Sequence, residues 1–369
     1  MSPHTGVARP LKLGEIRAAG WLYRQIWNDL ERGFAGCLDR LVPDLFEGDA
    51  IYGSRRLGLE SAAKHLGTTN QGDDLVEQQM WWNSETQSNW WDGLIRAAVQ
   101  VDHPQMLQKV REYTERILAS QDADGYLGIY APEARFDFNR ENGELWAQAC
   151  LLRGLLAWHE ASGQAAVLQA VERAVAVTMQ ACGLNGSNPF DVDQTICGPE
   201  HGLMFTDVLD RLYFLTGDVR YRDHCHGLYE AFSRGSTTER DAAMDHLLDP
   251  DYRLLGHGVH TAEHLRAVVN AAHASGDPLL ERVLAGYLQK LEPCLMPSGA
   301  LIGDEYIQQR AADASTTGYE YGSSHEVLDS YCSLLLKSGD PAWAERIEWL
   351  LFNAGPGART TDGRAVAYC

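Results

Sequence analysis

The sequence predicts an all-α protein, an (α/α)6 barrel of helical hairpins. One unit recurs along the chain, in which an apolar helix, a short turn and an amphipathic helix follow one another. The copies lie at 93–117, 151–175, 208–232, 265–288 and 329–352. A repeat of this size is typical of a helical array or toroid. The first helix of each pair is the more uniformly apolar, which favours an inner ring of helices shielded by an outer ring.

The turns inside the hairpins carry helix-ending and helix-capping residues. Glycines stand where a helix ends in the left-handed conformation, and aspartates follow where they can cap the next helix. Prolines occupy the first helical position of two second helices. These residues are Gly163, Gly217, Gly276 and Gly339, then Asp218, Asp277 and Asp340, then Pro278 and Pro341. With an N-terminal helix over 22–41 the hairpins approach six pairs, so we expect residues 1–369 to form one barrel domain.

The linkers between hairpins are long, polar and aromatic, unlike the turns within them. They span 120–144, 182–202, 248–264 and 296–325, and each leads into the first helix of a pair. Since those helix starts share one end of a toroid, all four linkers should lie on one face. Long loops in a compact domain are usually functional, so the site is expected there.

Composition excludes several classes of function. A formal charge of −20 argues against nucleic acids and anionic membranes, which need basic surfaces. No stretch is apolar for the roughly 18 residues that a membrane helix needs. The N-terminus lacks an apolar signal core, and the eight cysteines form no CxxC pair. We therefore expect a cytoplasmic protein with reduced thiols; homo-oligomerisation is left open.

Two glutamates in the last linker are the candidate catalytic pair. Glycoside hydrolysis commonly uses two carboxyl groups that flank the scissile bond. Glu305 and Glu320 stand just ahead of an apolar helix, and Tyr321 beside them is a candidate sugar contact. The alternative is that both glutamates only cap helices or face water.

Histidines in two other linkers are candidate substrate ligands. His257 and His260 open the helix after 248–264, and His201 stands at the end of 182–202. His260 and His264 share a helix face at a spacing that suits a metal, but the HEXXH order of metalloproteases is absent. We interpret His257 as a ligand of a sugar hydroxyl; a structural histidine is the alternative.

Paired tryptophans flank Glu85 just before the predicted helix at 93. Trp81-Trp82 and Trp90-Trp91 are candidates for stacking on a sugar ring, and Glu85 and Trp91 are assigned to substrate binding. Closure of the apolar core is the alternative interpretation of these tryptophans.

Together these segments resemble the β-L-arabinofuranosidase family of glycoside hydrolases. Four stretches carry the likeness: QDADGYLGIY, GELWAQACLLRGLLAWHEASG, GHGV and the C-terminal IEWLLFNAGPGARTTDGRAVAY. The N-terminal LKLGEIRAAGWLYRQ and SETQSNWWDGL add to it. The resemblance implies retaining hydrolysis with a zinc-held cysteine as nucleophile, Glu305 as acid/base and Glu320 as a zinc ligand.

Three departures concern the zinc centre. Gly322 stands where the family's first zinc cysteine would be, and Cys150 where the family often has histidine. Cys369 does not match the downstream cysteine pair. Either this chain is part of a longer protein, or it is a branch with changed chemistry. No metal ligand is assigned, and zinc is expected to bind weakly or not at all because a thiolate site needs these ligands.

The sequence therefore predicts a carbohydrate-active enzyme, a glycoside hydrolase of the arabinofuranosidase kind. Two alternatives stay open. One is a sugar epimerase or isomerase on the same barrel, which would move a proton with His257 or His260 and a carboxylate. The other is a non-catalytic carbohydrate-binding protein that has lost the metal–thiolate centre.

Overall fold

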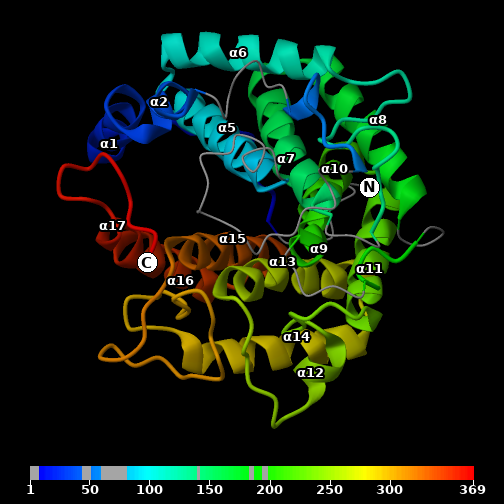
Figure 1. The fold of residues 1–369 in the computed structure, drawn as a ribbon. Coiled ribbons are helices and arrows are strands. Elements are labelled where there is room, and N and C mark those ends of the chain that lie inside the picture. The colour runs from blue at the N-terminus through cyan, green and yellow to red at the C-terminus, as the bar shows by residue number, and fades with distance from the viewer. Residues whose placement is uncertain (1–7, 44–50, 60–80, 139–141, 183–186, 193–197) are drawn as a thin grey trace. The chain divides into compact units, whose positions relative to one another are not determined.

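The computed structural model describes residues 8–43, 51–59, 81–138, 142–182, 187–192 and 198–369. Over these ranges the regular structure is helical, and strand-like pairing occurs as isolated bridges (Figure 1). The chain divides into two compact units, Leu11–Val208 and Leu209–Cys369, the second including the N-terminal residues up to Pro10. In the described part of the chain, no helix combines the length and apolarity needed to cross a bilayer.

The Leu11–Val208 unit holds two hairpins built on a pair of long helices, α5 and α7. Its helices are α1 (Gly20–Glu31), α2 (Phe34–Leu41), α5 (Trp81–Val101), α6 (Pro104–Ala119), α7 (Glu144–Ser162), α8 (Ala165–Ala181) and α9 (Gly198–His201). A 3-10 turn, η4 (Gly202–Met204), follows, and α10 (Phe205–Thr216) crosses into the next unit. Helix α5 packs along α7, and α6 and α8 return along their partners.

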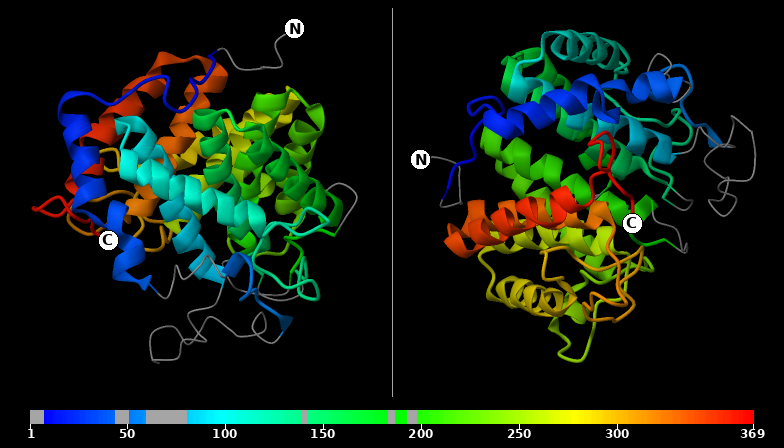
Figure 2. Two further views of the ribbon diagram at one scale, coloured as in Figure 1. Left: turned by 90° about the horizontal axis from the view of Figure 1, so that it is seen from above. Right: turned by 90° about the vertical axis from the view of Figure 1, so that its left-hand side faces the viewer.

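The Leu209–Cys369 unit repeats this arrangement around α13 and α15. Its helices are α11 (Val219–Arg234), α12 (Met244–Leu248), α13 (Gly258–Ser275), α14 (Pro278–Leu291), α15 (Tyr321–Ser338), α16 (Pro341–Phe352) and α17 (Ala354–Gly357), with a 3-10 turn η5 (Glu292–Cys294). Helix α13 packs against both α11 and α15, while α14 and α16 pair with α13 and α15 (Figure 2).

The predicted turn chemistry is confirmed. Gly163, Gly276 and Gly339 end their helices with φ of 71°, 61° and 70°, and Gly217 has φ 74°. The side chains of the three aspartates that follow accept the backbone N–H of Arg220, Leu279 and Ala342. The hairpin of α5 and α6 lacks such a glycine, and Asp102 takes the left-handed conformation there instead.

The contrast between the two helices of a hairpin is confirmed as well. Helix α7 is buried at almost every position of its first four turns, and α13 likewise from Gly258 to Ala272. Their partners α8 and α14 bury a single stripe. First helices that are apolar all round are thus enclosed by the elements of their own unit.

Two predicted helix boundaries are wrong. The expected helix over 22–41 is two helices, because Gly33 is extended, with φ −87° and ψ 172°, and becomes the start of α2. The expected helix at 93 begins at Trp81, since nothing from 81 to 92 is a glycine or proline that would interrupt it. The tryptophans were interpreted as a linker, although they lie within α5.

Within each unit, the linkers meet at the starts of the long helices. Gly198 lies against the carbonyl of Asn142, where an added Cβ would be 3.1 Å from the oxygen. In the other unit, Gly258 N–H donates to the Glu305 carbonyl at 2.7 Å and Ile307 N–H to that of Gly256 at 2.9 Å. Part of the linker 182–202, namely 183–186 and 193–197, lies outside the described residues. That all four linkers share one face stays a prediction.

The close approach of α2 to α1 gives a test of this packing. A Cβ on Gly36 would lie 1.6 Å from the carbonyl oxygen of Leu30, whereas one on Gly93 in α5 would meet nothing within 4 Å. Gly36→Ala should therefore lower the free energy of unfolding by about 1–3 kcal/mol. The matched Gly93→Ala should raise it by about 0.5–1 kcal/mol, since alanine favours a helix. Urea unfolding of both variants measures this; equal effects would contradict the α1–α2 contact.

Candidate active site

One imidazole and two carboxylates converge in the Leu209–Cys369 unit. His257 Nε2 lies 3.0 Å from Glu305 Oε2 and 3.5 Å from Glu320 Oε2. The three groups offer ligand atoms that all lie within 4.8 Å of one another. The structure thus brings together three residues that the sequence placed in two separate linkers. Such a set can share a proton or hold a divalent metal ion.

Backbone contacts hold these three side chains in place. His257 is the residue before α13, and the next N–H, of Gly258, donates to the carbonyl of Glu305. Glu305 itself has φ 82°, a left-handed conformation that side chains rarely adopt. Non-glycine residues in this region are strained and cluster at functional sites. The helix start and the loop therefore position each other.

The two carboxylates differ in environment. The Glu305 side chain is 47% exposed, whereas that of Glu320 is 7% exposed. Glu320 is the residue before α15, where the helix dipole favours a negative charge. An added Cβ on Gly322 would lie 3.1 Å from Glu320 Oε1, so this position faces the buried carboxylate. One acid is presented to solvent and the other is kept inside.

The histidine between them is held in its neutral form. Burial is the main cause that lowers the pKa of His257, and the nearby charge of His260 lowers it further. Glu305 and Glu239 oppose this without reversing it. At neutral pH the ring therefore carries one N–H, and Nε2 can donate it to a carboxylate.

Glu239 and Asp241 belong to this site, and sequence reasoning missed both. Glu239 Oε2 accepts from His260 Nδ1 at 2.6 Å. Burial would raise the pKa of Glu239, but the charge and hydrogen bond of His260 outweigh it and lower the pKa to about 2. Asp241 accepts from the backbone of the loop that ends at His257. Neither residue stands in a periodic or recognisable motif.

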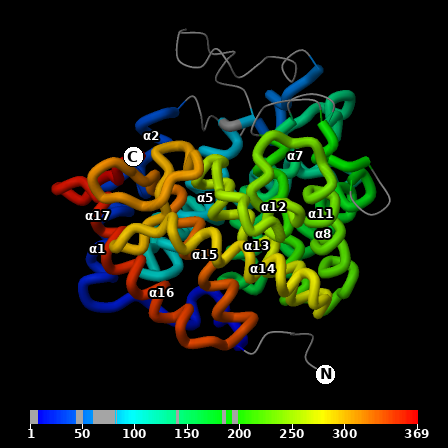
Figure 3. The backbone as a smooth tube through the Cα atoms, turned by 90° about the horizontal axis from the view of Figure 1, so that it is seen from below, coloured from blue at the N-terminus to red at the C-terminus, as the bar shows by residue number. Residues whose placement is uncertain are grey.

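Aromatic residues border Glu305. Tyr306 is 41% exposed and meets the His257 ring edge-on, with ring centroids 5.4 Å apart. Tyr368 is 63% exposed, and burial of its hydroxyl with the charges of Glu320 and Glu305 raises its pKa. The chain end reaches the site because Tyr321 N–H donates to the Tyr368 carbonyl at 2.9 Å (Figure 3). Tyr321, a predicted sugar contact, is thus the first residue of α15 at this site.

The remaining predicted ligands lie in the Leu11–Val208 unit. His201 ends α9 and stacks on Trp146 of α7, with ring centroids 4.7 Å apart. Trp91 is 3% exposed and stacks on Tyr113 of α6 at 3.8 Å. This contact contradicts the prediction that Trp91 stacks on a sugar, because the ring packs in the core as the alternative proposed. Glu85 is half-buried on α5.

A buried carboxyl group lies at the start of α7 in the same unit. Glu144 is 0% exposed, and its Oε1 accepts from the hydroxyl of Tyr126 at 2.8 Å and the amide of Gln148 at 2.9 Å. Burial raises the pKa of Glu144 to about 7, against these hydrogen bonds. The network attaches the loop after α6 to α7 and holds an acid that is neutral in mildly acidic solution.

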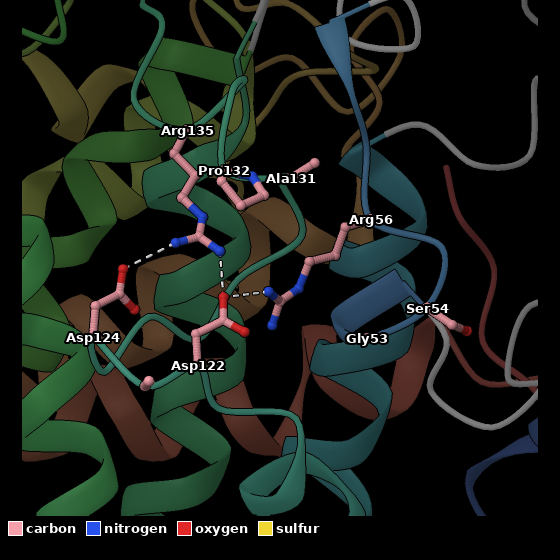
Figure 4. Close-up of a pocket in the computed structure, with 9 residues that line it drawn as sticks. Gly53, Ser54, Arg56, Asp122, Asp124, Ala131, Pro132 and Arg135 are labelled. Carbon is pink, nitrogen blue, oxygen red and sulfur yellow. Dashed lines mark hydrogen bonds and ion pairs between the residues drawn. The ribbon is translucent and has the colours of Figure 1, made fainter.

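The outer side of that loop forms a pocket of about 660 Å³ (Figure 4). The guanidinium groups of Arg56 and Arg135 both point to the carboxylate of Asp122, and Arg135 also reaches Asp124 at 3.2 Å. The Arg135 guanidinium lies 3.8 Å from the centre of the Tyr126 ring. These contacts neutralise the aspartates and secure the loop that leads to Glu144.

Comparison with known families decides the relationship. The description "β-L-arabinofuranosidase, GH127 catalytic domain" matches residues 51–369. The chain belongs to the GH127 β-L-arabinofuranosidase family. None of the curated proteins matches the sequence. The matched range of this GH127 chain includes His257, Glu305 and Glu320.

Solved structures confirm the predicted (α/α)6 barrel class. A GH127 β-arabinofuranosidase has a TM-score of 0.71 at 13% identity over 99% of this chain and 57% of its own. The GH127 β-L-arabinofuranosidase of Geobacillus stearothermophilus T6 has a TM-score of 0.70 at 15% identity, over 94% of this chain and 56% of its own. This GH127 chain spans somewhat more than half the length of both.

A cellobiose 2-epimerase from Bacillus thermoamylovorans B4167 is also similar in fold. Its TM-score is 0.52 at 11% identity, over 94% of this chain and 93% of its own. The likeness shows a shared architecture that supports more than one kind of sugar chemistry.

The raised pKa of Glu144 predicts a pH-dependent stability. Unfolded, the carboxyl loses its proton near its ordinary pKa of 4.5, whereas folded it does so at about 7. The stabilisation is therefore complete below pH 4.5 and is lost as the pH rises to 7. Glu144→Gln, which cannot ionise, should match the wild type at pH 4 and be more stable above pH 7, by up to about 3 kcal/mol.

Urea unfolding at pH 4, 6 and 8 measures this difference. The control is Glu115→Gln on α6, whose side chain is exposed. A constant difference between Glu144→Gln and the wild type at all three pH values would show that the buried carboxyl is already ionised in the folded protein.

Proposed function

We propose that this protein is a glycoside hydrolase in which Glu305 and Glu320 are the reacting carboxyl groups. The observation that carries the proposal is the pairing of one imidazole, His257, with both carboxylates at 3.0 and 3.5 Å. Membership of the GH127 family supports the reaction class. The assignment of roles rests on the geometry alone.

Exposure assigns the two roles. Glu305, nearly half exposed, can reach the leaving-group oxygen of a bound sugar as a proton donor. Glu320 is buried at a helix N-terminus, where an ionised carboxylate is stabilised. Glu305 is therefore the acid, and Glu320 is the carboxylate that faces the anomeric carbon.

The spacing of the two carboxylates favours a retaining reaction. Their ligand oxygens lie within 4.8 Å, whereas inverting enzymes keep carboxyl groups roughly 6.5–9.5 Å apart to admit a water. In the first step the glycosidic oxygen takes the proton of Glu305 as its bond to the anomeric carbon breaks, and a Glu320 oxygen bonds to that carbon. In the second step water attacks this carbon, Glu305 takes its proton and Glu320 is released.

His257 serves both carboxylates in this scheme. Its Nε2–H can donate to Glu320 or Glu305, so that one negative charge is stabilised while one proton is held between them. His260, Tyr321 and the exposed ring of Tyr306 would contact the sugar beside the reacting bond. We assign His201 and Glu85 to substrate binding as well, from their place in the predicted linker and helix.

The residues present do not fit a zinc–thiolate centre. Gly322 faces Glu320 with no donor of its own. Among the described cysteines, Cys369 lies near enough that burial and the charges of Glu320 and Glu305 raise its thiol pKa, which disfavours a thiolate. The scheme above therefore uses carboxylates only, and weak zinc binding stays a prediction.

The preferred substrate class is a β-L-arabinofuranoside, after the family. A cytoplasmic location stays a prediction from the scattered cysteines, and homo-oligomerisation stays open.

One observation favours epimerisation as a second candidate. Beside His257 and Glu305 stands another imidazole–carboxylate pair, His260 and Glu239, at 2.6 Å. Two such pairs could remove and return a proton at a sugar carbon. Uptake of deuterium from D₂O into a recovered, unhydrolysed sugar would favour this reaction over hydrolysis.

The acid role of Glu305 predicts a leaving-group effect. Glu305→Gln should lower kcat about 10²–10⁴-fold on methyl β-L-arabinofuranoside, whose alcohol needs protonation, and much less on the 4-nitrophenyl glycoside. Steady-state rates on the two substrates measure this.

The matched control is Asp304→Asn, the neighbouring carboxylate, which is 48% exposed and pairs with Arg310 at 2.6 Å. Its rates should stay within about twofold of the wild type. Loss of activity in Asp304→Asn with an active Glu305→Gln would reverse the assignment.

A further inference from the structure

Glu239 contacts both histidines of the site from outside the segments that carry the reacting groups. It lies in the loop between α11 and α12, and its side chain is 13% exposed. Its Oε2 accepts from His260 Nδ1 at 2.6 Å and from the backbone N–H of His257 at 2.9 Å. One carboxylate oxygen thus fixes the main chain at one histidine and the ring of the other.

The loop that carries Glu239 is itself fixed by Asp241. The carboxylate of Asp241 accepts from Leu255 N–H at 3.1 Å, Gly256 N–H at 2.9 Å and the hydroxyl of Thr261 at 2.8 Å. An added Cβ on Gly256 would lie 3.2 Å from Asp241 Oδ2 and 3.4 Å from Glu239 Oε2. The segment before His257 therefore passes tightly over both acids, which leaves Glu239 little freedom.

The hydrogen bond to Glu239 sets the state of His260. Since Nδ1 must carry the proton that it donates, the ring is held either as that tautomer or as the imidazolium. A neighbouring carboxylate favours the charged form. The His260 ring lies 5.0 Å from that of His257, so its charge acts directly on the ring that meets the reacting carboxylates.

We propose that Glu239 is a positioning residue that holds His257 and His260 in register and keeps His257 neutral, so that its Nε2–H faces Glu305 and Glu320. The role in turnover rests on the proposed glycosidase function; the effect on the histidines does not. The titratable groups that face the His257 ring are Glu305, Glu320, Tyr306, His260 and Glu239. Among these, Glu239 is the one that contacts both rings' supports without facing the sugar side.

The test uses Glu239→Gln, which keeps the size of the side chain and an acceptor oxygen but removes the charge. The control is Glu281→Gln, an exposed carboxylate in the first turn of α14. NMR of ¹⁵N-histidine-labelled protein follows each ring through a pH titration, with signals assigned from His257→Gln and His260→Gln. Rates on 4-nitrophenyl β-L-arabinofuranoside are measured over the same pH range.

In Glu239→Gln the pKa of His260 should fall and that of His257 should rise, by about one unit or more. The kcat should fall about 10–100-fold, as when a carboxylate that orients a histidine is removed, with KM little changed and the acidic limb of the pH profile displaced upward. Glu281→Gln should leave all of these unchanged.

Unchanged histidine titrations in Glu239→Gln would overturn the proposal, whether or not the protein hydrolyses the glycoside. Shifted titrations in a protein without hydrolase activity would support the positioning role while rejecting the proposed function. If Glu239→Gln does not fold, Glu239→Asp replaces it, because it keeps the charge but shortens the reach. His260 should then stay charged with a weakened Nδ1 hydrogen bond, and a titration of His257 and His260 identical to the wild type would count against the proposal.

Discussion

The contact of His257 with two carboxylates is the constraint on which the rest of the site depends. These residues come from two linkers, and their meeting requires that α13 and α15 start side by side. The backbone bond from Gly258 to Glu305 ties those starts together, and the strained conformation of Glu305 is kept by it. The hairpins supply the frame, since α13 packs along α15 over its length. A long polar linker is ordered here because its polar groups are used at a helix start.

Two buried glutamates illustrate how surroundings decide the charge of one residue type. Glu144 meets only neutral donors, so burial dominates and its proton is retained up to about pH 7. Glu239 meets an imidazole at 2.6 Å, and this partner outweighs burial, so the carboxylate stays ionised. The first anchors a loop and the second sets the state of a histidine. Burial alone would not have separated these roles.

The sequence was informative wherever a structural rule acts locally. Helix period, left-handed glycines and capping aspartates predicted the hairpins, and the last two linkers predicted His257, Glu305 and Glu320 as neighbours. The start of α5 was missed because aromatic residues without glycine or proline are compatible with both a helix and a linker. Trp91 was misassigned for the same reason, since its partner Tyr113 lies in the next helix. Glu239 and Tyr368 act through contacts between distant segments, for which a single sequence carries no local signal.

The central claim is that two carboxylates, spaced for direct attack, do the chemistry in a GH127 barrel whose zinc–thiolate ligands are not present at this site. The anomeric form of the first product tests it most directly, by ¹H NMR during hydrolysis of a β-L-arabinofuranoside by the wild-type protein. The account predicts that β-L-arabinofuranose forms first and then mutarotates. Initial release of the α anomer would mean that water attacks directly, and the close pair of Glu305 and Glu320 would not be the reacting pair.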